Sequence, residues 1–446
     1  MSTLPISPAE PAWAAFAAID WGSQNHAWSV VPAGGGPVQS GKFENTPEAV
    51  ELWVAVLRRQ FPGGPIAVAL EQKRGAVIYM LSKYDHLVLY PVPPAMSASY
   101  RHAFAPSGAK NDAGDAALLL DLLRQHRDRL RPIWQDTPDT RLLRFLVEQR
   151  RKLVQQKVRV VQQLTDTVPQ YFPQLRTWFG ALDTPLVAAL VSRWPTLRDL
   201  QRAHPGTLSR FFTQHHCRNE RVMADGFQLI YDAISATNDE VVVEACTRNT
   251  TAFISLLKVL GEQITALEKR IAEVTAEHPD APIFASFPGA GAATVPRLIA
   301  AFGTDRNAWQ SAADLKRLSG IAPVSISSGK STYVGIRRAC PKFLRQTFHE
   351  FAGQSIPFSE WAKLYYQHHL REDKARHHLA VRALAFQWIR ILYRCWKDRQ
   401  PYDERIYLEA QRRRNSPLSG KLAGSTPLAW VSEAGFQKLA KQPSST

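Results

Sequence analysis

Cysteine is scarce in this chain, with four residues among 446. The four lie far apart and form no CxxC pair, so the sequence predicts neither a zinc site nor a disulfide framework. We interpret them as free thiols, largely buried, in a reducing compartment. They are Cys217, Cys246, Cys340 and Cys395.

Long apolar runs are also missing. No stretch approaches the ~20 consecutive apolar residues that a membrane-spanning helix needs. The apolar segment 11–19 is short, is ended by Asp20 and follows no basic residues. We therefore predict no signal peptide and no membrane partner.

Acidic residues are outnumbered, at 39 Asp+Glu against 55 Lys+Arg, which gives a formal net charge of +16. An excess of this size favours a polyanionic partner, because Lys and Arg displace condensed counterions from nucleic acid. The apolar fraction of 45% is ordinary and allows a sizeable core. The length suggests about two to four domains.

The first part of the chain alternates strand-like and helix-like patterns. A continuous apolar run at 66–70 is typical of a central strand covered on both faces. The order predicts a ribonuclease-H-like α/β domain, which we place at residues 14–135. The expected elements are strands at 16–20, 26–31 and 38–43, a helix at 45–59 capped by Asn45 or Thr46, a strand at 66–70, a helix at 75–84 and a strand at 87–91.

Four carboxylates lie at the ends of predicted strands or at the start of a predicted helix in this domain. Asp20 and Glu71 each end an apolar strand, where an acid is costly unless it is paired or metal-bound. Asp112 and Asp115 share a face at the start of a helix predicted over 112–130, although acids there often only complement the helix dipole. Carboxylates that converge on one point suit Mg²⁺, and two such ions can assist phosphoryl transfer. The four residues therefore predict a magnesium site.

Residues 136–279 have a helical texture. The stretch 142–164 is strongly basic, and we predict that Arg150, Arg151 and Lys157 contact a nucleic-acid backbone, the alternative being an ordinary solvated face. Further on, apolar residues recur at alternating four- and three-residue spacings, which predicts a coiled-coil hairpin or a dimer arm. These are Phe253, Leu257, Leu260, Ile264, Leu267, Ile271 and Val274.

We expect a third, mostly α domain at 280–405 and a basic, flexible tail at 406–446. The segment Phe287-Pro-Gly-Ala-Gly291 resembles a helix-hairpin-helix motif, in which the amides of Gly289 and Gly291 would hold a phosphate. A helix that simply begins after a turn is the alternative.

A serine lies in a glycine turn near several cations. Ser328 directly precedes Gly329, and a serine so placed could attack a phosphodiester while cations stabilise the developing charge. Ordinary turn chemistry is the alternative. The cations are Lys330, Arg337, Arg338, Lys342 and Arg345.

Two sets of motifs occur in the order of a known family. The first is Ala18-Ile-Asp20, Ala69-Leu-Glu71 and Lys110-Asn-Asp112-Ala-Gly-Asp115-Ala; the second is Phe287-Pro-Gly-Ala-Gly291, Gly320-Ile-Ala-Pro323, Ser328-Gly329 and Cys340-Pro-Lys-Phe-Leu-Arg345. Together they resemble the DEDD-type bacterial insertion-sequence transposases, the bridge-RNA-guided recombinases related to the Piv/MooV invertases. The resemblance extends over about residues 15–405.

The resemblance implies a RuvC-like domain in which Asp20, Glu71, Asp112 and Asp115 bind Mg²⁺, or Mn²⁺ in its place. It implies that Ser328, in a C-terminal serine transposase domain, forms a phosphoserine link to DNA. The implied partners are donor and target DNA and a structured noncoding guide RNA. A dimer of dimers would join the acidic domain of one protomer to the serine domain of another, in the bacterial cytoplasm at the nucleoid.

Some features depart from the family pattern or leave alternatives open. Gln72-Lys-Arg-Gly75 stands where many relatives have Thr-Gly or Cys-Gly, which obscures the subgroup. Ser327 or Ser325 could be the nucleophile instead of Ser328. A Holliday-junction-type endonuclease that uses metal and water, with a structural Ser328, is the second hypothesis. A nucleic-acid-binding protein without activity is the third, and the complete carboxylate set argues against it.

Overall fold

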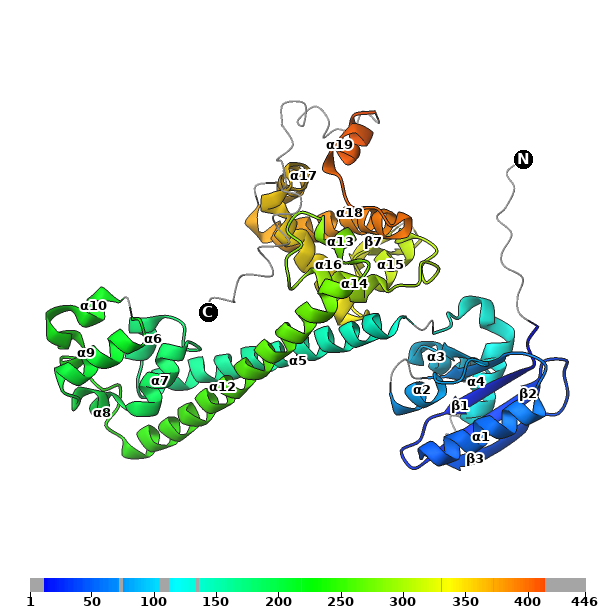
Figure 1. The fold of residues 1–446 in the computed structure, drawn as a ribbon, viewed down its shortest axis with the longest axis horizontal. Coiled ribbons are helices and arrows are strands. Elements are labelled where there is room, and N and C mark those ends of the chain that lie inside the picture. Colours follow the sequence, from blue (N-terminus) through cyan, green and yellow to red (C-terminus); the bar gives the residue numbers. More distant parts are fainter. Residues whose placement is uncertain are drawn as a thin grey trace. The chain divides into compact units, whose positions relative to one another are not determined.

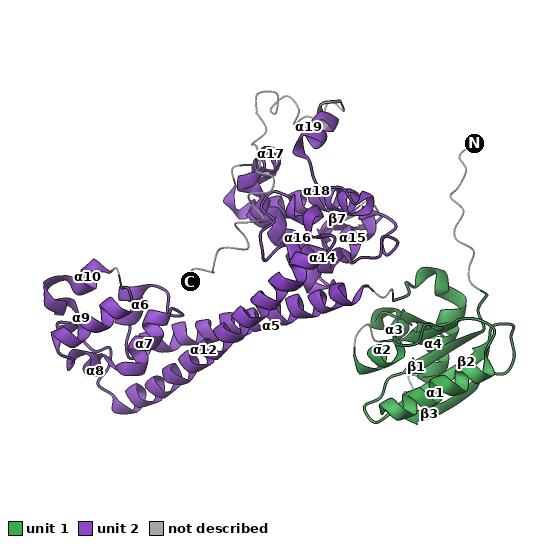
Figure 2. Ribbon diagram, viewed as in Figure 1, with its two compact units in different colours: residues 1–135 green, residues 136–446 purple. Residues whose placement is uncertain are grey.

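The computed structural model describes residues 12–71, 75–104, 112–133, 136–217, 219–329, 331–371 and 373–413. The chain divides into two compact units, residues 1–135 and 136–446 (Figure 2). The first unit is mixed α/β and the second is mostly helical (Figure 1). Among the described helices, none combines the length and apolar character needed to cross a membrane.

The first unit is built on a five-stranded sheet. Strands β1 to β3 form an antiparallel meander, whereas β1, β4 and β5 run parallel, so β1 lies between β2 and β4. The predicted three hairpin strands, followed by alternating helices and strands, are confirmed. The strands are β1 (Ala15–Asp20), β2 (Asn25–Pro32), β3 (Gln39–Glu44), β4 (Ile66–Leu70) and β5 (Leu87–Pro91).

Helices α1 (Pro47–Gln60) and α2 (Ala76–Leu81) cover one face of this sheet. Thr46 caps α1, since its hydroxyl accepts a hydrogen bond from the amide of Ala49 at 3.2 Å. Alternate residues of β1 and β4 point to this side. They are Ala15, Ala17, Ile19, Ile66, Val68 and Leu70.

Helices α3 (Pro94–Phe104) and α4 (Asp112–His126) pack on the opposite face. Here β1 and β4 present small side chains, among them Ala18 and Ala69, which let the leucines of α4 pack closely on the sheet. The helix predicted over 112–130 is α4 followed by a 3-10 turn, Arg127–Arg129. The sequence pattern did not predict α3.

Two long helices, α5 (Pro138–Thr167) and α12 (Glu240–Glu277), pack side by side in the second unit (Figure 1). They are antiparallel, because Thr140 bonds His278 while Arg150 bonds Glu268. The predicted apolar positions Leu257, Ile264 and Ile271 of α12 are buried. The two helices therefore form a hairpin within the chain.

Short helices between α5 and α12 enclose a core of their own, which also includes Leu164 of α5 and Leu257 of α12. Several helices begin with a side-chain cap, for example Thr184 and Thr196. The helices are α6 (Gln174–Phe179), α7 (Pro185–Arg193), α8 (Leu197–Gln201), α9 (Pro205–Gln214), α10 (Glu220–Met223) and α11 (Gln228–Tyr231), with 3-10 turns at Val168–Gln170 and Ala224–Phe227.

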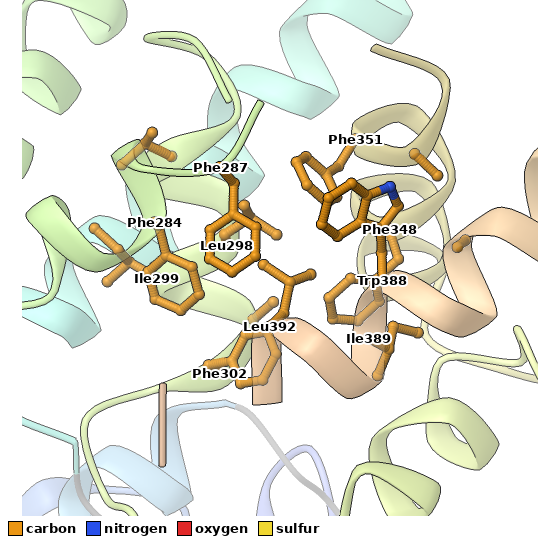
Figure 3. Packing of buried hydrophobic residues seen from close by; sticks show 14 of the residues in the cluster. Phe284, Phe287, Leu298, Ile299, Phe302, Phe348, Phe351, Trp388, Ile389 and Leu392 are labelled. Carbon is orange, nitrogen blue, oxygen red and sulfur yellow. The ribbon is translucent and has the colours of Figure 1, made fainter. Parts of the chain in front are cut away.

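The C-terminal helices pack at the other end of the α5–α12 hairpin. Their core is rich in aromatic side chains, including Phe287, Phe302, Phe351 and Trp388 (Figure 3), and it includes Val147 of α5. The helices are α13 (Ala281–Ala285), α14 (Val295–Phe302), α15 (Ala312–Leu318), α16 (Lys342–Ser355), α17 (Glu360–Leu370), α18 (His377–Asp398) and α19 (Glu404–Arg413), with 3-10 turns at Ile356–Phe358 and Lys374–Arg376.

Two features modify the expected C-terminal organisation. Strands β6 (Pro323–Ser328) and β7 (Ser331–Ile336) form an antiparallel hairpin among the helices. Helix α19 extends beyond residue 405, where we expected the tail to begin, and Leu408 is buried in the core. Residues 414–446 lie outside the described part of the chain.

Candidate active site

The ends of two neighbouring strands bring the first two carboxylates to one edge of the sheet. Strands β1 and β4 are parallel, and Ile19 pairs with Leu70, so Asp20 and Glu71 come next along each strand. Side chains alternate between the faces of a sheet. Because Ile19 and Leu70 point towards α1, Asp20 and Glu71 belong to the face that α3 and α4 cover.

Helix α4 adds the helical aspartates on the same face. Asp115 is 7% exposed and precedes the buried residues Leu119 and Leu122 by four and seven positions, which places it on the stripe that faces the sheet. Asp112 is the first residue of α4, and its side chain lies outside the described part of the structure. Burial of a carboxylate such as Asp115 requires a partner that compensates its charge.

That partner comes from α3. A guanidinium nitrogen of Arg101, Nη2, lies 2.9 Å from Oδ1 of Asp115. One turn earlier, the hydroxyl of Ser97 donates a hydrogen bond to Oε1 of Glu71 at 2.5 Å. Residues four apart on a helix are neighbours on one face, so a single face of α3 contacts both carboxylates. The two contacts connect Glu71 and Asp115 through one helix.

Sequence reasoning missed Ser97 and Arg101. Their four-residue spacing is a helical signal, and Met96, Tyr100 and Phe104 recur at the same spacing. A helix over this segment could therefore have been recognised from the sequence. A serine and an arginine on a helix are common surface residues. Only their contacts with Glu71 and Asp115 mark them as part of the site.

The donor set has the chemistry that Mg²⁺ prefers, namely several hard carboxylate oxygens. Arg101 and Ser97 each engage one of the two oxygens of their carboxylate partner. Among the side chains that the structure describes, no group of three or more His, Cys, Asp or Glu surrounds a common point at metal-binding distances. The side chain of Asp112 lies outside this described set. The carboxylates fit a divalent cation in two respects: their donor atoms are oxygens, and they lie on one face of the sheet.

Ser328 is the last residue of β6, at the tip of the β6–β7 hairpin. Gly329 follows with φ of +57°, a left-handed conformation that favours glycine in tight hairpin turns. All six residues of β6 are exposed. The turn therefore explains why glycine follows Ser328. Within its own unit, Ser328 is exposed.

The hairpin separates the three candidate serines. Ser328 pairs with Ser331 and shares a face with Ile326, two residues earlier. Ser327 lies on the opposite face, and so does Ser325. A substrate bound to one face of the hairpin would meet Ser328 or the other two, but not all three.

The predicted cations follow the hairpin. Arg337 bonds the carbonyl of Ala339 through Nε at 3.0 Å, while Arg338 is exposed. Lys342 and Arg345 lie in the first turn of α16, three residues apart and on one face. Lys330 lies outside the described residues. The described cations thus gather after β7 and at the start of α16.

Arg382 of α18, which sequence reasoning also missed, holds the base of the hairpin. Its Nε donates to the carbonyl of Ile321 at 3.1 Å, and Nη2 donates to that of Gly320. Gly320 has φ of +68°, and an added Cβ would lie 2.6 Å from the sulfur of Cys340. At the Gly-Ile-Ala-Pro motif the backbone therefore passes close to Cys340 and is held by Arg382, and these contacts orient β6.

The two glycines of the Phe287-Pro-Gly-Ala-Gly291 motif differ in their structural requirements. Gly289 has φ of +76°, and a Cβ there would lie 2.5 Å from the carbonyl oxygen of Gln354. A Cβ at Gly291 would meet nothing within 4 Å. Both line an open pocket of about 460 Å³ beside Thr294 at the start of α14. Packing explains Gly289, and it leaves Gly291 free for a close approach by a ligand.

The three basic residues of α5 that we expected to contact nucleic acid are paired within the chain. Arg150 donates to Oε1 of Glu268 on α12 at 2.8 Å through Nε. Arg151 bonds Glu148 at 2.8 Å, and Lys157 lies 3.0 Å from a carboxylate oxygen of Asp183. The Arg150 contact joins the two long helices, the Lys157 contact joins α5 to the segment before α7, and the Arg151 contact lies within α5.

Two family models match regions of this chain. Residues 17–173 match the family model DEDD_Tnp_IS110, described as a transposase, and residues 281–367 match one described as "Transposase IS116/IS110/IS902 family". The first region contains the carboxylates and the second contains Ser328.

Curated relatives are similar over nearly their whole length. A Streptomyces coelicolor protein, named as a candidate transposase for the IS117 mini-circle, is 24% identical over 87% of this chain and 95% of its own. A 43.6-kDa protein of insertion element IS110 from the same species is 26% identical over 76% and 86%. A 42-kDa protein of insertion element IS900 from Mycobacterium paratuberculosis is 24% identical over 88% and 98%.

Proposed function

Because the chain belongs to the IS116/IS110/IS902 family of transposases, we propose that it mobilises an insertion element by cutting and rejoining DNA strands. The observation that carries this proposal is the combination of a carboxylate face in the first unit with an exposed serine hairpin in the second. Both lie within the matched regions. The formal charge of +16 supports a DNA partner.

We propose that Asp20, Glu71, Asp112 and Asp115 hold Mg²⁺, with Mn²⁺ as a substitute. The bound cation would stabilise negative charge on the phosphodiester as a Lewis acid. The side chains themselves bind and orient the ion, and the strand ends that carry Asp20 and Glu71 give them a rigid backbone.

Ser328 is the proposed nucleophile. Its Oγ forms a bond to phosphorus while the bond from phosphorus to the leaving deoxyribose oxygen breaks, and the serine proton passes to a base or to water. Attack by a different deoxyribose hydroxyl on the phosphoserine ester then rejoins the strand and releases Ser328. Arg338, Lys342 and Arg345 would neutralise the phosphates around the hairpin.

The exposure of the hairpin supports an assembled active site. Ile326, Tyr333 and Val334 are each at least 60% exposed on their own unit, and exposed apolar side chains of this kind commonly mark interaction surfaces. We propose that the hairpin of one protomer meets the carboxylates of another in a dimer of dimers. A structured guide RNA that pairs with donor and target DNA is part of the same proposal, and the charge of the chain supports it.

Covalent trapping tests the nucleophile. The protein, with its co-purified RNA and Mg²⁺, is incubated with labelled donor DNA, denatured, and resolved by electrophoresis. We expect a protein–DNA adduct that is lost in Ser328→Ala and in Asp115→Asn. Ser327→Ala, on the opposite face of the hairpin, is the matched control and should retain the adduct.

The alternative is a Holliday-junction-type endonuclease that uses metal and water. Cleaved DNA without an adduct, at the same rate in wild type and Ser328→Ala, would establish that alternative and make Ser328 a turn residue. An adduct lost in Ser327→Ala instead would move the nucleophile by one position.

A further inference from the structure

We propose that helix α3 is a positioning element for the metal site, in which Ser97 orients Glu71 and Arg101 orients Asp115. Through these two contacts α3 would set both the affinity of the carboxylates for Mg²⁺ and their preference for Mg²⁺ over Ca²⁺. This inference rests on the proposed metal site and assigns it two residues that do not themselves bind the ion.

The contact of Ser97 is buried and short. Ser97 is 2% exposed, and its Oγ lies 2.5 Å from Oε1 of Glu71 and 3.1 Å from the carbonyl oxygen of Pro94. A buried hydroxyl that donates to a carboxylate forms a charge-assisted hydrogen bond, which is stronger and more directional than a neutral one. The contact therefore restricts the rotation of the Glu71 carboxylate.

Arg101 plays the corresponding part for Asp115. The side chain of Asp115 is 9% exposed and that of Arg101 is 31% exposed, so water screens their pairing only in part. Nη2 contacts Oδ1, while the Nε of Arg101 is buried and has no hydrogen-bond partner among the described residues. A buried Nε without a hydrogen-bond partner costs free energy. The surroundings of Arg101, rather than an ideal bidentate ion pair, therefore hold its guanidinium in place.

Helix α3 itself is firmly attached to α4. The hydroxyl of Tyr100 donates a hydrogen bond to Oδ2 of Asp121 at 2.6 Å, and burial together with this bond raises the pKa of Tyr100 to about 12. The ring of Tyr100 packs against the cluster of buried residues between α4 and the sheet, as does Met96. Ser97 and Arg101 thus project from a backbone that is fixed relative to both carboxylates.

Ser97 and Arg101 should affect metal affinity through the carboxylates that they contact. Residues that bond a metal ligand from behind commonly contribute 10–100-fold to metal affinity, because they hold the ligand in its binding orientation. Mg²⁺ demands a near-octahedral arrangement at short distances, whereas Ca²⁺ accepts irregular, longer coordination. Loosening Glu71 or Asp115 should therefore weaken Mg²⁺ more than Ca²⁺.

A competing interpretation makes the opposite prediction for Arg101. If its guanidinium only compensated the charge of Asp115, it would compete with the incoming cation, and its removal would tighten metal binding. Ser97 is uncharged, so its substitution removes the hydrogen bond to Glu71 without removing a cation from the site. The two residues together therefore distinguish orientation from charge competition.

The experiment measures metal binding by the full chain without nucleic acid. Mn²⁺ is titrated and followed by electron paramagnetic resonance, and Mg²⁺ and Ca²⁺ are then added as competitors. For Ser97→Ala and for Arg101→Met we expect about tenfold weaker Mg²⁺ binding or more, with a lower ratio of Mg²⁺ to Ca²⁺ affinity. Arg101→Lys, which keeps the charge, should fall between wild type and Arg101→Met.

Two matched controls lie on the same helices. Ser99→Ala removes a hydroxyl of α3 that bonds only the carbonyl of Ala95 among the described residues, and Arg124→Met removes an exposed cation of α4. Both should bind Mn²⁺ and Mg²⁺ as wild type does. Thermal unfolding in EDTA identifies any variant that fails to fold, and Arg101→Lys then replaces Arg101→Met in the comparison.

Unchanged Mg²⁺ binding in Ser97→Ala, or tighter binding in Arg101→Met, would overturn the positioning role while leaving the metal site in place. If wild type binds no Mn²⁺ and Asp115→Asn behaves identically, the proposed metal site fails and this inference fails with it. The two failures are therefore distinguishable by wild-type binding alone.

Discussion

At the scale of single residues, His278 shows how the second unit joins its helices. The ring follows the end of α12, where Nδ1 accepts a hydrogen bond from the amide of Asp280 at 3.1 Å and Nε2 lies 2.8 Å from the hydroxyl of Thr140 on α5. Since Nδ1 must accept, the neutral ring carries its proton on Nε2 and donates to Thr140. Protonation of Nδ1 would break the bond to Asp280.

The pKa of His278 lies below its ordinary value of 6.5, mainly because burial disfavours the charged ring. The unfolded chain therefore takes up a proton before the folded chain as the pH falls. The contribution to stability is complete above pH 6.5 and is lost as the pH falls from 6.5 through the folded pKa, by about 1.4 kcal/mol for each unit of depression.

We expect His278→Gln to weaken this pH dependence. Urea unfolding at pH 7.5 and pH 5.5 should show a smaller loss of unfolding free energy on acidification than in wild type. The pKa values of His26, His86 and His349 are also lowered, but these residues are common to both proteins and cancel in the comparison. An identical loss in the two proteins would contradict the role of His278.

At the scale of elements, the ion pairs of α5 give its basic face a second explanation besides contact with nucleic acid. A run of positive charge on a helix suggests a nucleic-acid contact when only the local sequence is considered. Glu268 lies 118 positions from Arg150 along the chain, and Asp183 lies outside the helix that carries Lys157, whereas Glu148 is in the same helix as Arg151. Ion pairs of this kind contribute modestly to stability, but they leave less uncompensated charge to attract phosphates.

Neutralising Arg150, Arg151 and Lys157 together to Gln should therefore affect DNA binding little. Three phosphate contacts would change the slope of log affinity against log salt by about 3 units. We expect a change of less than about 1 unit, accompanied by a lower unfolding temperature. Filter binding at several salt concentrations measures the slope.

The matched comparison for this prediction uses the cations near the hairpin, which are Arg338, Lys342 and Arg345. Their triple substitution by Gln should reduce the slope by about 2 to 3 units. A larger change for the α5 substitutions than for these would restore α5 as a nucleic-acid contact.

At the scale of the whole molecule, the cores of the two units are separate. The residues buried on either face of the sheet all come from the first 130 positions, whereas the cores of the second unit begin with Leu143. Units with separate cores can unfold as separate cooperative transitions. Each unit can therefore fold around its own core, which the proposed assembly of carboxylates and serine requires.

A pair of equivalent core substitutions tests this separation. Leu122 and Leu384 are each fully buried, in the first and second unit respectively. Replacing either by Ala should cost about 2–5 kcal/mol, and in calorimetry each should lower only the transition of its own unit. Equal displacement of all transitions by both substitutions would show that the chain unfolds as one body.

Much of the first unit follows from local sequence. The apolar run at 66–70 predicts β4 and places Glu71 directly after it. Thr46 caps α1, as expected of a threonine that precedes a helix. The acids at 20, 71 and 115 were identified by position along the chain, because strand and helix periodicity decides which face a residue occupies. Once the order of the strands is known, the same periodicity places these three acids on one face of the sheet.

The contacts that complete the site were decided by tertiary structure. Ser97 and Arg101 reach Glu71 and Asp115 because α3 packs against α4. A helical pattern in 94–104 can indicate the helix, but it does not say which carboxylates the helix will contact. The pairing of Arg150 with Glu268 joins residues 118 positions apart. Periodicity is a local property, whereas an ion pair depends on where distant segments meet. The sequence alone thus determined which residues could do chemistry, and the fold decided which of them are held, paired or exposed.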